Sequence, residues 1–168
     1  MLSADDVLQQ YRKGQRDFGG AQLQGINLSL ADLSHIHLHR ANLSQALLHG
    51  ADLICAQATR ADFTQAKLIG VNLDGADCSS SIFCSALLSQ ASLAGTCFYK
   101  ADLSKAILNY CFLQGADLRY ANLTGANLSQ ANLSGADLYG ATLKMVDLAS
   151  AILQDTILPD GQVSRSSE

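Results

Sequence analysis

The sequence has few of the residues from which globular domains usually build a core. It contains no tryptophan and one proline in 168 residues, and aromatic residues make up only 6% although 48% of the residues are hydrophobic. The length is that of a single domain. A core with so few large side chains needs monotonous packing of small and medium ones.

What is missing also excludes several classes of protein. No apolar run approaches the ~20 residues that span a bilayer, so we expect no membrane association. The N-terminal segment carries acidic residues early and no apolar stretch, so we expect no secretory signal and a cytoplasmic location. The formal net charge of −4 argues against direct binding of nucleic acid through phosphate contacts.

In place of these features the sequence has a five-residue repeat. From Phe18 to Leu158, every fifth residue is Leu or Phe except Ala58 and Cys78. The residue two positions before these centres is usually small, Ala in 20 of 29 repeats, and the residue between them is Asp or Asn in 15. With a period of five, the centres would not all lie on one side of a helix, nor would they all lie on one side of a straight strand. A short extended segment followed by a bend in every repeat keeps all the centres on the inside. Four such repeats should therefore close a square coil of 20 residues.

Two further features agree with such a coil. The small centres Ala58 and Cys78 occur in the same coils as the large centres Phe63 and Phe83, as a constant interior volume requires. The Asp or Asn between the two inward residues suits a turn, because its side chain can accept a hydrogen bond from the backbone. We therefore interpret these polar residues as structural.

The repeat A-(D/N)-L-X-X, clearest in residues 116–143, resembles the pentapeptide repeat family, and the resemblance covers residues 16–160. It implies an all-β fold, a right-handed quadrilateral parallel β-helix of about seven coils. Members are abundant in cyanobacteria and most have no known activity. We predict an N-terminal capping helix at 1–15, the β-solenoid at 16–160 and a disordered tail at 161–168.

The two ends of the solenoid need covering, because a stack of coils exposes unpaired backbone there. At the N-terminus, Ser3 can cap a short helix through about Lys13, with Val7, Leu8 and Tyr11 facing the first coil. At the C-terminus we predict either that the tail folds back or that two chains meet end to end in a homodimer. The residues of this candidate end-to-end contact are Ile152, Leu153, Ile157 and Leu158.

The sequence gives little support for catalysis or for a bound cofactor. It has no G-x-S-x-G, phosphate-loop or zinc-helix motif, and a solenoid without long loops offers no evident pocket. His35, His37 and His39 alternate along the chain and Cys55 would stack on His35, but their spacing is not that of a metal site. We favour solvated histidines, five free cysteines, and no catalytic, cofactor or metal site.

The most informative departures from the repeat are apolar residues at outward positions. A clustered set on one wall of a regular scaffold is typical of an interaction surface. We therefore predict a non-enzymatic protein-interaction or regulatory module whose protein partner the sequence does not identify. The candidate interaction surface consists of Leu30, Leu47, Ile69, Leu87, Ile107, Tyr110 and Phe112.

An alternative function is suggested by the resemblance itself. Similar proteins include acidic solenoids that imitate DNA and act as inhibitors or protectors of DNA gyrase. Here Asp117 and Asp137 would form an acidic step, yet Arg40, Arg60 and Lys100 would stack along one corner. The charges are therefore mixed in sign, which favours the interaction module over the DNA mimic.

Overall fold

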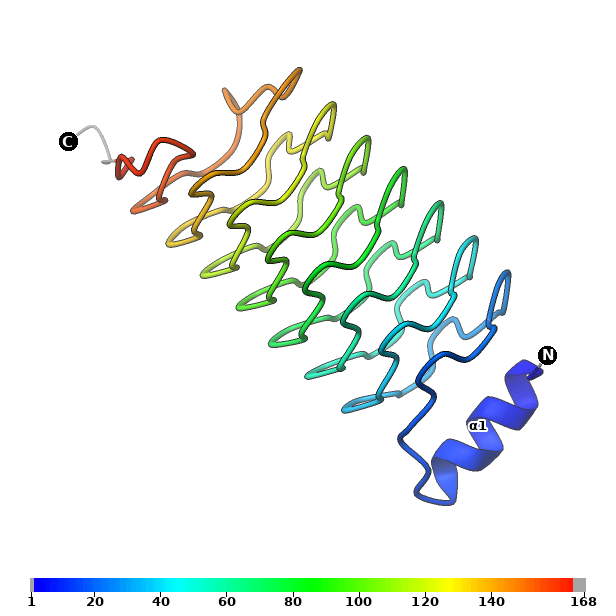
Figure 1. The fold of residues 1–168 in the computed structure, drawn as a ribbon. Coiled ribbons are helices and arrows are strands. Elements are labelled where there is room, and N and C mark those ends of the chain that lie inside the picture. The colour runs from blue at the N-terminus through cyan, green and yellow to red at the C-terminus, as the bar shows by residue number, and fades with distance from the viewer. Residues whose placement is uncertain (1, 165–168) are drawn as a thin grey trace.

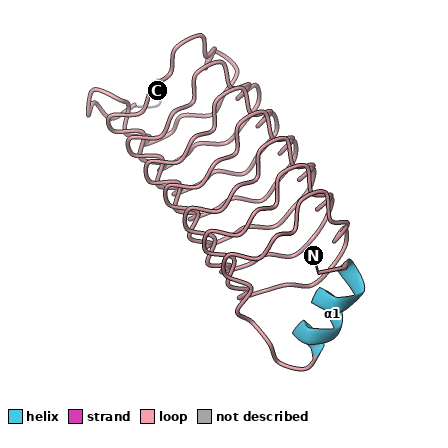
Figure 2. Ribbon diagram, turned by 45° about the vertical axis from the view of Figure 1, so that its right-hand side comes forward, coloured by secondary structure: helices cyan, strands magenta, loops and turns pink. Residues whose placement is uncertain are grey.

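The structure, a computed structural model, describes residues 2–164 as a straight stack of coils with a helix at its N-terminal end (Figures 1 and 2). The helix, α1, comprises Ala4–Arg12. The rest of the described chain is made of turns and single-residue bridges, without the extended strands expected of an all-β fold. A bend in every repeat limits the pairing to one residue, which explains this difference.

The bridges join residues that are 20 positions apart and run parallel, so four repeats make one coil. Backbone hydrogen bonds run in both directions between coils: the Leu68 N–H donates to the Leu87 carbonyl at 2.7 Å, and the Leu87 N–H donates to the Ala66 carbonyl at 2.9 Å. The four walls are called first to fourth, and their first centres are Phe18, Leu23, Leu28 and Leu33, respectively. In the first wall the bridged residues extend from Asp17 to Ile157.

Each corner is a tight turn that bends the backbone from one wall to the next after the centre. The Ala66 N–H donates to the carbonyl of the centre Phe63 at 2.9 Å, and Gln65 between them has a φ of 57°. The same left-handed conformation recurs at the last residue of the repeats. It favours glycine but is also adopted by Gln, Lys, Arg and Tyr here. The turn therefore sets the five-residue period and leaves its last position free to vary.

The residue before each centre stabilises this turn with its side chain. In all 15 repeats that have Asp or Asn there, the Oδ1 atom accepts a hydrogen bond from the N–H two residues later. The bond from the Thr64 N–H to Asp62 is 2.8 Å long. The structural role that we inferred for these residues is thus confirmed.

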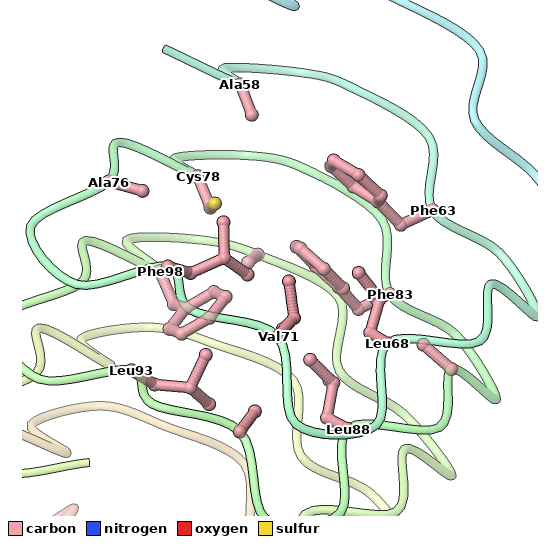
Figure 3. Packing of buried hydrophobic residues seen from close by; sticks show 14 of the residues in the cluster. Ala58, Phe63, Leu68, Val71, Ala76, Cys78, Phe83, Leu88, Leu93 and Phe98 are labelled. Atoms are coloured by element: carbon pink, nitrogen blue, oxygen red, sulfur yellow. The ribbon is translucent and has the colours of Figure 1, made fainter. Parts of the chain in front are cut away.

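The interior is dry and closely packed. The Phe63 and Phe83 rings stack at 4.6 Å with an interplanar angle of 9°, while Ala58 and Cys78 occupy the same levels on the neighbouring wall (Figure 3). The edge of Phe98 meets the Phe83 ring at 5.5 Å. Large centres therefore lie beside small ones, as the sequence predicts.

Helix α1 covers the first coil. Ser3 and Asp6 form a capping box, Val7 is fully buried, and the Tyr11 hydroxyl donates to the Ser34 carbonyl at 2.7 Å. The helix does not lie flush on the coil, however. A cavity of about 480 Å³ lies between them, with Leu30 in its lining. The expectation that the solenoid has no evident pocket is therefore wrong at this end.

The C-terminal end is partly covered by the chain itself. After the last repeat the chain turns at Gly161, so that Ile157 and Val163 form an antiparallel bridge and the Leu158 N–H donates to the Gln162 carbonyl at 2.7 Å. Residues 161–164 are thus ordered in a hairpin, whereas we expected a disordered tail from 161. Residues 165–168 lie outside the described part.

The third wall ends one coil before the second and fourth walls, and two coils before the first. Asn127 pairs with Ile107 below it, but no bridge joins it to Asp147 in the next coil, although both residues are described. Figure 1 shows this segment in orange at the C-terminal end, standing off from the coil beside it. Met145, at its corner, is 82% exposed. The third wall is therefore regular only through residues 127–130.

Candidate interaction surface

The candidate residues gather mainly on the third wall. Leu47, Lys67, Leu87 and Ile107 follow one another in a single ladder, one residue per coil, because each bridges the next. Ile69 projects from the same wall and is 38% exposed. The three aliphatic residues of the ladder are half-buried. Together these residues form an apolar stripe parallel to the long axis of the solenoid, interrupted by one lysine.

The other three candidates lie at the corner between the third and fourth walls. Tyr110 and Phe112 flank this corner in the same coil as Ile107 and are 54% and 52% exposed, so they extend the stripe. Leu30 is 82% exposed but lies four coils away from Tyr110, beside the cavity under α1. The structure therefore brings six of the seven residues into one surface and leaves Leu30 at its N-terminal margin.

The candidate end-to-end contact is divided between covered and open residues. Ile157 and Leu158 pair with the C-terminal hairpin and are only partly exposed. Leu153 is also half-buried, whereas Ile152 is 52% exposed. Of the two alternatives for this end, the structure shows that residues 159–164 fold back over part of the last coil.

A second cluster, on the first wall, was not predicted from the sequence. The rings of Tyr99, Tyr120 and Tyr139 meet edge to face at 5.8 and 5.7 Å and form an aromatic ladder over three coils. Their separations are 21 and 19 residues, so a search at the coil period of 20 does not align them. They meet because the last two positions of a repeat are neighbours at the same corner.

The Arg119 side chain contacts both this aromatic ladder and the acidic residues beside it. Its guanidinium donates two hydrogen bonds to Asp117, at 2.8 and 2.7 Å, and lies 3.8 Å from Asp137. It also lies 5.6 Å from the centre of the Tyr99 ring. The hydrogen bond from Arg119 lowers the pKa of Asp117. Arg119 thus offsets one of the two negative charges of the acidic step formed by Asp117 and Asp137.

The histidines lie in several walls, and two of the five cysteines lie in the core. His37 pairs with Asp17 and Gln57 in the first wall. Across residues 2–164 the structure places no three His, Cys, Asp or Glu side chains where they could share a metal ion. All five cysteines are free, as predicted. Cys78 and Cys111 are buried, and burial raises the pKa of the Cys111 thiol to about 12.

Within the described residues, no helix is both long enough and apolar enough to cross a membrane.

Comparisons with known proteins identify the repeat. The family model for pentapeptide repeats matches the chain in several overlapping segments that extend from residue 17 to residue 155. A search of curated proteins gave no match.

Solved structures show the same architecture. HetL, a pentapeptide repeat protein involved in heterocyst differentiation regulation from the cyanobacterium Nostoc sp. strain PCC 7120, is 26% identical with a TM-score of 0.63, and the match covers 98% of this chain and 100% of HetL. A trypsin-treated form of QnrB1, a plasmid-mediated fluoroquinolone resistance protein, is 22% identical with a TM-score of 0.54 over 88% of this chain and 76% of QnrB1. The chain belongs to the pentapeptide repeat family.

Proposed function

We propose that this protein is a non-enzymatic interaction module, and that the apolar stripe of Leu47, Ile69, Leu87, Ile107, Tyr110 and Phe112 binds a regulatory protein partner. The observation that carries this proposal is the stripe itself. Outward positions elsewhere in the repeat are mostly polar, and apolar residues clustered at outward positions of a rigid scaffold mark interaction sites. Tyr110 supplies the large amphipathic ring that is enriched at interface hot spots.

The likeness to HetL supports a regulatory role. It extends over nearly the full length of both chains, and HetL is involved in the regulation of heterocyst differentiation. Pentapeptide repeat proteins are in general interaction modules rather than enzymes, and the stripe lies on a smooth wall rather than in a cleft.

The test replaces the stripe with the residue that the repeat normally uses. Leu47→Asn, Leu87→Asn and Ile107→Asn together give their column the residue type of Asn27 and Asn127, which hold the turn by a side-chain hydrogen bond. We expect an unchanged melting temperature and at least a tenfold loss of partner capture in pull-downs from the native host.

The matched control is Ile82→Asn, which makes the same kind of change on the second wall, where Ile82 is 40% exposed. It should leave capture unchanged. If the triple variant captures the partner as well as the wild type does, the stripe is not the binding surface.

A DNA mimic remains the alternative function. The likeness to QnrB1 supports the shared fold alone, and Arg119 offsets half of the negative charge of the acidic step that the alternative needs. A DNA-supercoiling assay with gyrase separates the two functions. We expect no effect at micromolar protein, whereas inhibition or protection of gyrase would favour the mimic.

We also propose a homodimer through the C-terminal coil. The hairpin covers only part of the last coil, and Ile152 beside it and Val163 within it are each 52% exposed. Sedimentation equilibrium is expected to give twice the chain mass of 17.8 kDa, and Ile152→Asp should return it to the monomer mass. A wild-type protein that is monomeric at tens of micromolar would remove this proposal.

A further inference from the structure

The third wall differs from the other three in charge as well as in hydrophobicity. The sequence has 15 acidic residues, of which the first and fourth walls each contain at least four and the second contains two, Asp62 and Asp102. In the regular part of the third wall, with both of its corners, there is no Asp or Glu. These segments are 25–30, 45–50, 65–70, 85–90, 105–110 and 125–130. The basic residues in these segments are Lys67 and Lys105. One wall of this acidic protein is therefore positively charged.

Lys67 lies in the middle of the apolar stripe. It bridges Leu47 on one side and Leu87 on the other, and Ile69 projects from the same level of the wall. Its side chain is exposed and forms no ion pair within residues 2–164. A partner that covers Leu47 and Leu87 must also cover this ammonium. Burying it without a carboxylate would weaken binding, because an unpaired buried charge is costly.

The spacing of the stripe indicates the shape of the partner. Its members recur once per coil, about 4.8 Å apart along the solenoid axis. Successive turns of an α-helix laid along this axis present side chains about 5.4 Å apart. An extended chain in the same direction presents same-face side chains about 6.6 Å apart. Over three coils the helix drifts out of register by about 2 Å and the strand by about 5 Å, so the helix fits better.

We propose that the partner contributes an amphipathic helix with a single Asp or Glu inside its apolar face, and that this carboxylate pairs with Lys67. The helix lies along the third wall, with apolar side chains against Leu47, Leu87 and Ile107 and the acidic one between the first two. This inference rests on the proposed function, since it names the partner chemistry of the same stripe. Lys67 then acts as the determinant of specificity, because a helix with a basic or neutral residue there is rejected.

The experiment works without the natural partner. A phage library displays a 20-residue helical scaffold that is randomised at four positions of one face, one position per turn. It is selected in parallel against the wild-type protein, Lys67→Glu and Lys67→Gln. We expect wild type to enrich an acidic residue flanked by apolar ones and Lys67→Glu to enrich Lys or Arg at that position. Fluorescence anisotropy with the best wild-type peptide should show about fivefold weaker binding and a smaller salt dependence for Lys67→Gln.

Two outcomes overturn the inference in distinguishable ways. If the selected helices require Leu87 and Ile107 but show the same composition with Lys67→Glu, the stripe binds and Lys67 does not select. Selection on the wild type is compared with selection on the Leu47→Asn, Leu87→Asn, Ile107→Asn variant. If the wild type enriches no helical peptides that the variant does not also enrich, a library of extended peptides is selected in the same way. If that library yields peptides whose binding depends on the stripe, the partner contributes an extended strand and not a helix. If neither library yields such peptides, the result also contradicts the proposed function.

Discussion

At the scale of single residues, the Asp or Asn before each centre holds the bend that follows it. Its Oδ1 atom accepts the N–H two residues later, as Asp62 does from Thr64. A net stability of about 1 kcal/mol is typical of such a bond. The sequence predicts this role because the residue type and the position recur together.

Asp62→Ala should therefore lower the free energy of unfolding by about 1 kcal/mol, because the Thr64 N–H loses its acceptor. Asp62→Asn should be nearly neutral, since Asn42 and Asn122 make the same bond in the same wall. Chemical denaturation measures both. The control is Gln57→Ala, at an equivalent position without a side-chain hydrogen bond. An equal loss in Asp62→Ala and Gln57→Ala would contradict this assignment.

The buried thiols give a second prediction at this scale. Burial raises the pKa of Cys111 to about 12, whereas in the unfolded chain a thiol ionises near pH 8.5. Above about pH 8.5 the unfolded state therefore releases a proton that the folded state retains, and stability falls as the pH rises. At pH 8.5 iodoacetamide should label exposed Cys55 roughly a hundredfold faster than Cys111. Mass spectrometry of the labelled peptides checks this, and comparable rates in the folded protein would contradict the dry core.

At the scale of elements, the tyrosine ladder joins three coils to the C-terminal hairpin. Tyr120 lies over Gly140, where an added Cβ would come within 2.6 Å of its ring, and Tyr139 approaches Gly161 of the hairpin turn. Successive coils are therefore in contact through these aromatic rings as well as through the backbone. Edge-to-face aromatic pairs contribute about 0.5–1.5 kcal/mol each beyond the area they bury.

Gly140→Ala should displace the Tyr120 ring and break its contact with Tyr139, with a loss of roughly 1 kcal/mol beyond the backbone effect. Gly115→Ala is the matched control, because Gly115 has nearly the same φ of 65° and nothing within 4 Å of the added Cβ. Near-ultraviolet circular dichroism reports the tyrosine environment and thermal melts report stability. Identical spectra for the two variants would show that the ladder is not closely packed.

At the scale of the whole molecule, the core could be predicted from the sequence and the surface only in part. The positions of Leu and Ala in the repeat identify the inward-facing residues, because the same five-residue period holds throughout the array. The tyrosine ladder was missed because spacings of 21 and 19 residues fall on two different positions of the repeat. The hairpin at Gly161 and the departure of the third wall after Gln130 depend on local contacts at an end of the stack, where the repeat no longer applies.

The candidate stripe was visible in the sequence because a 20-residue coil aligns Leu47, Leu87 and Ile107. The significance of Lys67 was not, because a lone lysine at an outward position is unremarkable in a sequence. Its importance depends on what the structure places around it. The bridges put it between two leucines, on a wall where the acidic residues of the other three are missing.

The most direct test of the third wall as the binding surface is site-specific photo-crosslinking in the organism that encodes the protein. A benzophenone side chain replaces Ile107 on the third wall in one strain and Gln57 on the first wall in another. We expect Ile107 to give a single crosslinked partner whose attachment maps to a helical segment, and Gln57 to give none. Crosslinks to the same partner from Gln57, with none from Ile107, would contradict the account.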